Sequence, residues 1–485
     1  MTSCCSIGRD RIQLEEIHRA NPASLPVAII GGGPVGLAAA AHLLDRGVEP
    51  IILEGAPNVG AAPVQWGHVS MFSPWRYNVD GAARGLLKAH GWTEPDPEAF
   101  PTGRELTERY LEPLASLPEM ATRLKLGTRV TGVARLGAGK VRNAGRKEQR
   151  FEVRFENLQG EQGRVLARAV VVATGTWQRP SPAGVSGLPA IGESEAADRI
   201  HYGMPDVLGV ERRRYARRRV LVVGSGHSAI GTLIDLAALM HEAPGTSVVW
   251  AARSADLTRA YGGGSADQLP ERGALGQRLR SLVETGMVEL VAPFGVDEIG
   301  RAGDGSLLVR DTRGREVEAD EMVVATGLRP DLGILGEVRL DLDPALECPR
   351  ALASLIDPNL HSCGTVRPHG AEELEQPDAG LFMAGMASYG RAPTFLLATG
   401  YEQVRSIAAF LAGDIEAARR VELDLPQTGV CSGAGGRPQI TAAASCCTPE
   451  TPQGTCCPPK VELPAAAACC GTSARREPAL AEPAE

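Results

Sequence analysis

The body of the chain opens on a pattern of apolar runs separated by a glycine turn. Val27 to Ile30 is a run of four apolar residues, which suits a strand that is covered on both faces. An alanine-rich stretch from Val35 to Arg46 predicts a helix, and Ile51 to Leu53 predicts a second strand that ends at Glu54. The turn before the helix contains Gly31, Gly33, Pro34 and Gly36. This order of elements predicts an α/β fold built on a parallel sheet.

The same pattern recurs further along the chain. Val220 to Val223 predicts a strand, Ser228 to His241 a helix and Val248 to Ala251 another strand. The turn between the strand and the helix contains Gly224, Gly226, Ser228 and Ala229. Arg253 follows the second strand at the place where the first unit has an acid. The sequence therefore predicts two units of the same design.

Both turns have the spacing of loops that bind dinucleotides. The glycines permit a tight turn and a close approach to a pyrophosphate, and the helix N-terminus attracts phosphate. Glu54 is placed to accept a hydrogen bond from a ribose hydroxyl in the first unit. Arg253 suits a 2′-phosphate, which favours NADPH over NADH in the second unit. A purely structural glycine turn and a solvated Arg253 are the alternatives.

Two more apolar strands, within 170–175 and 322–327, run into Ala-Thr-Gly. With them the chain resembles flavoproteins with two dinucleotide-binding domains, a superfamily that includes flavin-containing monooxygenases and thioredoxin reductases. The resemblance implies FAD at the first loop and NADPH at the second, with Thr174, Gly175 and Gly327 where the chain crosses between domains. It also implies flavin contacts at Gly385 and Met386, although many relatives have aspartate where this chain has methionine.

The resemblance divides the chain into segments. They are an N-terminal extension (1–25), a first FAD-binding segment (26–187) with a β-meander within 124–172, an inserted NADPH-binding domain (188–320), a second FAD-binding segment (321–425) and a tail (426–485). The tail has no aromatic residue and is rich in Pro, Ala, Gly, Ser and Thr. It cannot bury enough apolar area to offset its ordering entropy, which predicts disorder.

Composition narrows the class of protein. A hydrophobic content of 43% and a charged content of 22% are typical of a soluble globular protein. The net charge of −8 gives no reason to expect nucleic-acid binding. The first residues are polar and mixed in charge, without the apolar core of a secretory signal. We therefore expect a cytoplasmic protein that binds neither nucleic acid nor membranes.

The cysteines limit the chemistry that a bound flavin would support. Disulfide reduction needs a cysteine pair beside the flavin ring, but none of the 11 cysteines lies between Ser6 and Glu347. Oxygen activation needs no such pair, and flavin-containing monooxygenases use it to oxidise soft nucleophiles. His201 matches part of the signature of those enzymes, and a structural histidine is the alternative.

Candidate side chains for contact with the flavin gather in three places. The stretch 65–80 concentrates aromatic residues, and in relatives it approaches the flavin ring; an ordinary hydrophobic cluster is the alternative. The candidates, whose catalytic roles the sequence does not identify, are Trp66, His68, Arg76, Cys363 and Arg391. A small buried thiol is the alternative for Cys363.

The tail contains adjacent cysteine pairs, which are Cys446 and Cys447, Cys456 and Cys457, and Cys469 and Cys470. Structural zinc sites favour cysteines that are two to four residues apart, whereas neighbouring thiolates suit large soft acceptors such as trivalent arsenic or mercury(II). Together with "GSGHSA", "SCGTVRPHG" and "YGRAPTFLLATGYEQVRS", the pairs make the chain similar to flavoprotein monooxygenases of bacterial arsenic-resistance operons. Sequence drift in an unconstrained extension is the alternative for the pairs.

These observations support one hypothesis and two alternatives. The first is an NADPH-dependent FAD monooxygenase for a soft nucleophile such as trivalent inorganic or methylated arsenic, with dioxygen as co-substrate and tail thiols that capture the metalloid. The second is an NADPH-dependent flavin reductase or oxidase for another acceptor. The third is a non-catalytic thiol protein that binds metals or metalloids. The oligomeric state is left open.

Overall fold

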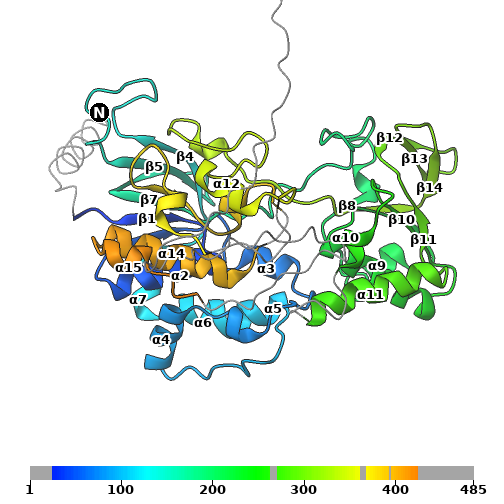
Figure 1. Ribbon diagram of the computed structural model, residues 1–485, viewed down its shortest axis with the longest axis horizontal. Coiled ribbons are helices and arrows are strands. Elements are labelled where there is room, and N and C mark those ends of the chain that lie inside the picture. Colours follow the sequence, from blue (N-terminus) through cyan, green and yellow to red (C-terminus); the bar gives the residue numbers. More distant parts are fainter. Residues whose placement is uncertain (1–23, 263–269, 361–367, 393–394, 424–485) are drawn as a thin grey trace, which may run out of the picture. The chain divides into compact units, whose positions relative to one another are not determined.

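The computed structural model describes residues 24–262, 270–360, 368–392 and 395–423 (Figure 1). Its first sheet consists of five parallel strands in the order β16-β7-β1-β2-β3. The strands are β1 (Val27–Ile30), β2 (Pro50–Leu53), β3 (Leu124–Lys125), β7 (Ala169–Val172) and β16 (Leu381–Met383). The parallel sheet predicted from the apolar runs is therefore confirmed.

One face of this sheet is covered by helices and the other by antiparallel strands. Val27 and Ile29 pack with residues of α2 (Pro34–Asp45) and α14 (Leu397–Leu411). Ala28 and Ile30 pack with residues of β4 (Thr128–Arg135) and β5 (Phe151–Asn157), which form an antiparallel sheet with β6 (Gln162–Ala167). Because successive side chains of a strand point to opposite faces, a strand between two layers is apolar throughout.

The second sheet repeats this design. Its five parallel strands have the order β11-β10-β9-β15-β8. Val220 and Val222 of β9 pack with residues of α9 (His227–Glu242), whereas Leu221 and Val223 pack with the antiparallel strands β12 (Val296–Arg301), β13 (Leu307–Asp311) and β14 (Glu316–Ala319). The other parallel strands are β8 (Ile200–Tyr202), β9 (Arg219–Val223), β10 (Ser247–Ala251), β11 (Glu289–Val291) and β15 (Glu321–Val324).

The remaining elements are mostly short. The longer helices are α4 (Gly81–Ala89), α11 (Pro270–Glu284) and α12 (Arg350–Ile356). The short ones are α3 (Ala61–Gln65), η2 (Trp75–Tyr77), α5 (Gly103–Leu106), the π-helical turn η3 (Thr107–Leu111), α6 (Glu112–Ala115), α7 (Pro118–Ala121), η4 (Ala197–Arg199), α8 (Arg212–Tyr215), α10 (Thr258–Tyr261), η6 (Gly333–Leu335), α13 (Ala371–Leu374), η7 (Gly385–Tyr389) and α15 (Ile415–Arg419). Within the described ranges, no helix combines the length and apolar character needed to cross a bilayer.

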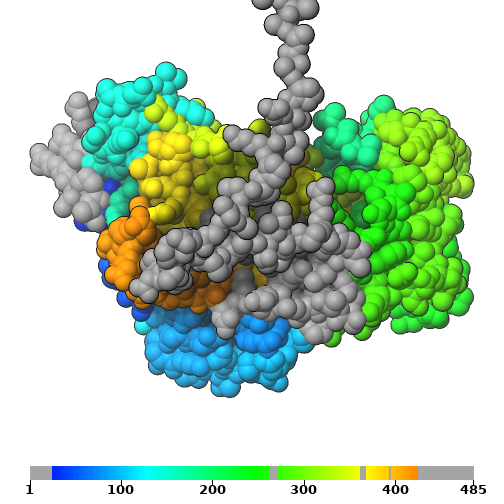
Figure 2. Space-filling model, viewed as in Figure 1, coloured from blue at the N-terminus to red at the C-terminus, as the bar shows by residue number. Residues whose placement is uncertain are grey.

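A buried ion pair ties the antiparallel sheet to the segment that leads into β16. Arg146, in the loop between β4 and β5, donates to both carboxylate oxygens of Asp378 at 2.9 and 2.6 Å, and both side chains are almost fully buried. The same loop meets the segment around residue 339 through hydrogen bonds from Arg339 to the carbonyl oxygens of Lys140 and Arg142. Figure 2 shows these two surfaces side by side, in teal and yellow.

Two expectations are refined by the strand pairing. The predicted meander covers only β4 to β6, because β3 and β7 at its ends belong to the parallel sheet. The division of the chain at residue 320 stays a prediction, and β15, which follows it, pairs with β9 in the second sheet. Both parallel sheets thus have a glycine-turn strand beside an Ala-Thr-Gly strand, as β1 lies beside β7 and β9 beside β15.

Candidate functional site

The first glycine loop contains two kinds of glycine. Gly31 has φ +112°, and a Cβ atom there would lie 2.6 Å from the carbonyl oxygen of Ala173, just after β7. A Cβ atom on Gly36 would lie 2.0 Å from the carbonyl oxygen of Gly31. Gly33, in contrast, has φ −82° at the N-cap of α2, and no atom lies within 4 Å of a Cβ atom built there. Gly31 and Gly36 are thus required by packing, whereas Gly33 leaves space in front of a helix N-terminus.

This space fits a phosphate group. It lies beyond the carboxyl end of β1, whose neighbours in the sheet are β2 and β7. Ligands of open parallel sheets bind at such a point, where the chain leaves adjacent strands in opposite directions. Pro34 occupies the first turn of α2, where its missing N–H costs no hydrogen bond. A side chain at position 33 would extend into this open space.

Glu54 lies against the same loop. Its carboxylate accepts hydrogen bonds from the backbone N–H groups of Gly32 at 2.5 Å and Ala56 at 2.8 Å. A Cβ atom on Gly32 would come within 3.0 Å of the Glu54 side chain. The acid expected to bind a ribose is therefore held at the edge of the loop, where it also satisfies two backbone donors.

The second glycine loop repeats the geometry of the first. Gly224 has φ +131°, and a Cβ atom there would lie 2.2 Å from the carbonyl oxygen of Ala325 after β15. Gly226, at the N-cap of α9, has φ −83° and no atom within 4 Å of a Cβ position. Ala229 takes the place of the third glycine and is fully buried against the sheet. The two loops lie far apart in the sequence, and each leaves open space in front of a helix N-terminus, at Gly33 and at Gly226.

One residue that supports the second loop was not predicted. The indole Nε1–H of Trp250, on β10, donates to the carbonyl oxygen of Gly224 at 2.7 Å. The sequence signal was available, because a tryptophan in a buried strand usually needs a partner for its N–H. Arg253 lies exposed just beyond the same strand, and Ser228, the second residue of α9, is partly buried and its carbonyl oxygen accepts a hydrogen bond from the hydroxyl of Thr232.

The two Ala-Thr-Gly segments differ in their surroundings but share a left-handed glycine. Gly175 has φ +68° and Gly327 has φ +106°, and neither has an atom within 4 Å of a Cβ position. Thr174 is exposed. The segments that follow them meet in an antiparallel bridge between Pro180 and Leu328. The sequence resemblance implies that the chain crosses between domains at these segments.

The predicted flavin turn at Gly385 packs on the first loop's helix. Gly385 has φ +66°, and a Cβ atom there would lie 3.2 Å from Cγ2 of Val35, in the first turn of α2. Met386, the next residue, is partly buried. Tertiary packing thus brings position 385 beside the residues that follow Gly33.

The aromatic loop is anchored from inside the protein. Trp75 is buried, and Trp66 packs so closely on Gly103 that a Cβ atom there would lie 2.5 Å from the indole. The ring of Phe72 lies 5.3 Å from the ring of His227, the first residue of α9. The hydrophobic-cluster alternative describes Trp75 well, whereas Phe72 touches the helix that follows the second glycine loop.

The polar candidates of this loop differ in exposure. His68 is partly buried. Arg76 is exposed, forms an ion pair with Glu98 and lies over the ring of Tyr77 at 4.8 Å. Arg76 is thus exposed and already paired, and its contact with a flavin stays a prediction.

Arg391 forms an ion pair with a residue of unusual backbone conformation. Its Nη2 lies 2.7 Å from Oε1 of Glu347, and this hydrogen bond holds the pKa of Glu347 below its usual value. Glu347 has φ +55°, a left-handed conformation that side chains other than those of Gly and Asn rarely adopt. The neighbouring Cys348 is buried, and burial raises its pKa to about 12, which makes it an unreactive thiol.

His201 lies on β8, paired with Val323 of β15. Its Nδ1 is 3.2 Å from Oε1 of Glu211. Burial lowers the pKa of His201, although the Glu211 carboxylate opposes this effect. This environment agrees with the structural alternative for the histidine.

Several predicted sites fall outside the described residues. They are Cys363 and the tail pairs Cys446 and Cys447, Cys456 and Cys457, and Cys469 and Cys470. In the part of the chain that the structure describes, no group of three or more His, Cys, Asp or Glu side chains could hold a metal ion.

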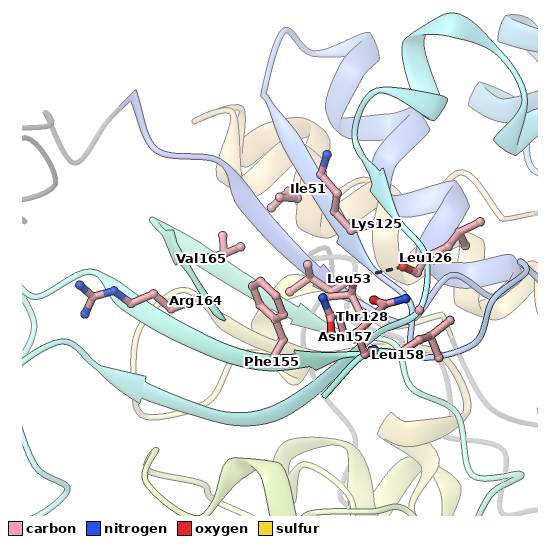
Figure 3. Close-up of a pocket in the computed structure, with 12 residues that line it drawn as sticks. Ile51, Leu53, Lys125, Leu126, Thr128, Phe155, Asn157, Leu158, Arg164 and Val165 are labelled. Carbon is pink, nitrogen blue, oxygen red and sulfur yellow. Dashed lines mark hydrogen bonds between the residues drawn. The ribbon is translucent and has the colours of Figure 1, made fainter. Parts of the chain in front are cut away.

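A separate cavity of about 440 Å³ lies between the edge of the first sheet and the antiparallel sheet (Figure 3). Ile51 and Leu53 of β2 line it from one side and Phe155 of β5 from the other, with Lys125 and Arg164 also contributing. Its lining includes no residue of either glycine loop.

Comparison with known proteins places the fold. The chain is 30% identical over 215 residues to the indole-3-pyruvate monooxygenase YUCCA1 of Oryza sativa subsp. japonica, which covers 43% of this chain and 44% of that protein. It is 25% identical over 329 residues to the ferredoxin–NADP reductase of Streptococcus pneumoniae serotype 2, strain D39, which covers 65% of this chain and 78% of that protein. The structure matches the bacillithiol disulfide reductase Bdr (YpdA) from Bacillus cereus with a TM-score of 0.57 and 20% identity, over 80% of this chain and 99% of that chain.

The rice enzyme is aligned over less than half of its length, so its activity does not carry over directly. A family description, pyridine nucleotide-disulphide oxidoreductase, matches residues 28–348. That range spans both glycine loops and both Ala-Thr-Gly segments, and roughly two thirds of the chain. The chain therefore belongs to the pyridine nucleotide-disulphide oxidoreductase family, and this membership supports FAD and NADPH as its two cofactors.

Proposed function

We propose that the protein is an NADPH-dependent flavin monooxygenase. The observation that carries the proposal is the pair of open sites at Gly33 and Gly226, each in front of a long helix and beyond the carboxyl ends of its own parallel sheet. The first would hold the pyrophosphate of FAD, with Glu54 at the ribose. The second would hold NADPH, with Arg253 pairing with the 2′-phosphate. Family membership supports the two cofactors, and the assignment of residues is ours.

A bound flavin would accept electrons from the nicotinamide and pass them to an acceptor, and this chemistry belongs to the cofactors. The protein supplies binding and position. The helix N-termini of α2 and α9 attract the phosphates, and the left-handed Gly31 and Gly224 keep each loop against the strand beside it. The buried Trp75 fixes the aromatic loop, which would keep water away from the reacting atoms.

Dioxygen is the proposed acceptor. The sequence has no cysteine between Ser6 and Glu347, so a disulfide relay of the kind that reductases use beside the flavin has no residues there. The buried Cys348 is too weakly acidic to serve as a thiolate. The similarity to a plant monooxygenase agrees with oxygen transfer.

The proposed substrate is trivalent inorganic or methylated arsenic. Its lone pair makes it a soft nucleophile, and the adjacent cysteines of the tail have the softness to capture it. In the overall reaction, NADPH provides two electrons and arsenic provides two. One oxygen atom of dioxygen becomes bound to arsenic, which reaches the pentavalent state, and the other is reduced to water.

The test follows NADPH consumption and arsenic speciation together. Purified protein with FAD should oxidise NADPH faster when arsenite or methylarsenite is added in air, and pentavalent product should form in proportion to the NADPH used. Without dioxygen neither should occur. If neither arsenic species accelerates NADPH consumption or becomes oxidised, the arsenic proposal is wrong.

A reductase is the second candidate, favoured by the similarity to ferredoxin–NADP reductase over 78% of that protein's length. A reductase would turn over a one-electron or two-electron acceptor in the absence of dioxygen, so the anaerobic arm of the same experiment separates the two. Removing residues 427–485 separates the role of the tail. The truncated protein should consume NADPH as before but bind arsenite more weakly, whereas unchanged affinity would support sequence drift.

A further inference from the structure

A buried hydrogen-bond network holds the turn at Gly385. The backbone N–H of Gly385 donates to Oε1 of Gln403 at 2.7 Å. Gln403 lies on α14 and is fully buried, as is Ser388, and His369 is 4% exposed. The amide Nε2 of Gln403 lies 2.9 Å from Oγ of Ser388 and 2.8 Å from Nε2 of His369.

The direction of each hydrogen bond in this network follows from one donor. A backbone N–H only donates, so the oxygen of the Gln403 amide must face Gly385 and its NH₂ group must face the other two partners. Ser388 then accepts from Gln403 and donates its own proton to the carbonyl oxygen of Gly385 at 2.7 Å. The nitrogen of His369 that faces Gln403 must accept, so the imidazole is neutral and carries its proton on Nδ1.

Gly385 is thus bound on both sides of its peptide backbone. Its N–H donates to Gln403 and its carbonyl oxygen accepts from Ser388, so both polar groups of this backbone position have a partner in the network. Gly385 has φ +66°, and glycine loses more conformational freedom on folding than any other residue, so the two hydrogen bonds help to fix a position that would otherwise be free to vary. Gln403 therefore holds one side of this turn and Ser388 the other.

The network also positions the turn relative to the first glycine loop. Cβ atoms on Gly385 and on Gly400 would lie 3.2 and 2.7 Å from the same atom, Cγ2 of Val35 in the first turn of α2. Gly400 precedes Gln403 by one helical turn on α14. The α14 helix, the turn at Gly385 and the start of α2 therefore form one packed unit, with Gln403 as its polar link.

The next residue, Met386, has no side-chain group that could bind a ribityl hydroxyl. We propose that Gln403 is a positioning residue for FAD, which holds the Gly385 turn beside α2 through the amide, hydroxyl and imidazole network. This proposal rests on the proposed function, because it takes the FAD site to be the first glycine loop. The network takes over, through the backbone, part of the positioning that an acid at position 386 would give.

The test compares two buried glutamines. Gln403→Leu removes the acceptor of Gly385. Gln376→Leu is the matched control, because Gln376 is also buried and also accepts from a backbone N–H, that of Asp341 at 3.0 Å. Gln403→Leu leaves the buried N–H of Gly385 without its acceptor, and Gln376→Leu leaves the N–H of the exposed residue Asp341 without one, so both should lower the melting temperature of the apoprotein, the first by more. Only Gln403→Leu should also raise the Kd for FAD, by about tenfold or more.

A milder replacement, Ser388→Ala, tests the same network if Gln403→Leu does not fold. Ser388→Ala keeps the bond between Gly385 and Gln403 but removes the link to the Gly385 carbonyl, and it should raise the Kd for FAD by about threefold. The Kd is measured by titrating apoprotein with FAD and following the quenching of flavin fluorescence. As a second readout, the flavin midpoint potential should shift in Gln403→Leu but not in Gln376→Leu.

The outcomes separate this proposal from the proposed function. If the unmodified protein does not bind FAD, both fail. If it binds FAD and Gln403→Leu binds it as tightly as Gln376→Leu does, only the positioning role is refuted. If Gln403→Leu does not fold, an unchanged Kd in Ser388→Ala refutes the positioning role instead.

Discussion

The replacement Gly33→Ala separates the binding role of the first loop from its folding role. Gly33 has φ −82°, which alanine adopts without strain, and a Cβ atom there meets nothing within 4 Å. Alanine is a weaker N-cap than glycine by some tenths of a kcal/mol, but it reduces the entropy of the unfolded chain by a similar amount. We expect the free energy of unfolding to change by less than about 0.5 kcal/mol.

The neighbouring replacement Gly31→Ala is the contrasting variant. Alanine at φ +112° is strained, and its Cβ atom would lie 2.6 Å from the carbonyl oxygen of Ala173, so the segment that follows strand β7 would have to move. A left-handed conformation alone costs about 1–2 kcal/mol, to which the overlap adds. We expect Gly31→Ala to lower the free energy of unfolding by more than about 2 kcal/mol.

Gly33→Ala, which should hardly change stability, should clearly weaken the binding of FAD. The methyl group of Gly33→Ala occupies the place of a phosphate that gains about 1–2 kcal/mol from a helix N-terminus, so the Kd for FAD should rise by about 5- to 30-fold. Gly226→Ala should weaken NADPH in the same way and leave FAD unaffected.

The assays are thermal or urea unfolding of each apoprotein, fluorescence titration with FAD, and titration of the FAD-loaded protein with NADPH. A folded Gly33→Ala protein that binds FAD with unchanged affinity would refute the assignment of the first loop. Loss of FAD in Gly226→Ala, with NADPH affinity unchanged, would show that the two loops have been assigned in the wrong order.

Three further replacements test the charge of Arg253, the backbone conformation of Glu347 and the buried carboxyl group of Asp235. Arg253→Gln should raise the KM for NADPH several-fold and leave the KM for NADH unchanged, which steady-state kinetics with both cofactors will show. Glu347→Gly should stabilise the fold by about 1 kcal/mol in urea unfolding, because relief of the left-handed strain exceeds the loss of a half-exposed ion pair with Arg391; Glu347→Gln, which keeps the strain, should not. Burial, reinforced by Asp206, raises the pKa of Asp235 to about 6. Because the folded protein keeps this proton to a higher pH than the unfolded chain does, the free energy of unfolding falls as the pH rises from about 4 to about 6 and then levels off. Asp235→Asn should therefore stabilise the protein by up to about 3 kcal/mol at pH 8 and by less at pH 4.5.

The local sequence pattern was enough to predict the first strand and the glycine loop that follows it. Val27 to Ile30 could be read as a strand buried on both faces because all four side chains are apolar, and the two faces are indeed covered by different layers. Gly31 and Gly33 could be placed in one loop because their spacing is local. Their different roles could not be predicted, since they depend on Ala173, which is distant in sequence and packs against only one of them.

Trp250 and Gln403, whose side chains hold glycine turns in place, also have hydrogen-bond partners that are distant in the sequence. Trp250 binds Gly224, and Gln403 binds Gly385, through contacts that exist only after the sheets and helices have packed. No periodicity in the sequence marks Gln403 as polar and fully buried, because α14 reads as an ordinary helix. Its role became visible only from the network that surrounds it.

The sequence by itself determined the class of fold and predicted two loops as dinucleotide sites, because both inferences follow from hydrophobic period and glycine spacing within a few dozen residues. Tertiary structure alone decided which glycines are needed for packing and which leave space for a phosphate. It also decided how the turn at Gly385 is held in a chain that has methionine and not an acid at position 386. The physical reason is that steric overlap and the satisfaction of buried hydrogen bonds depend on atoms that the chain brings together only when it folds.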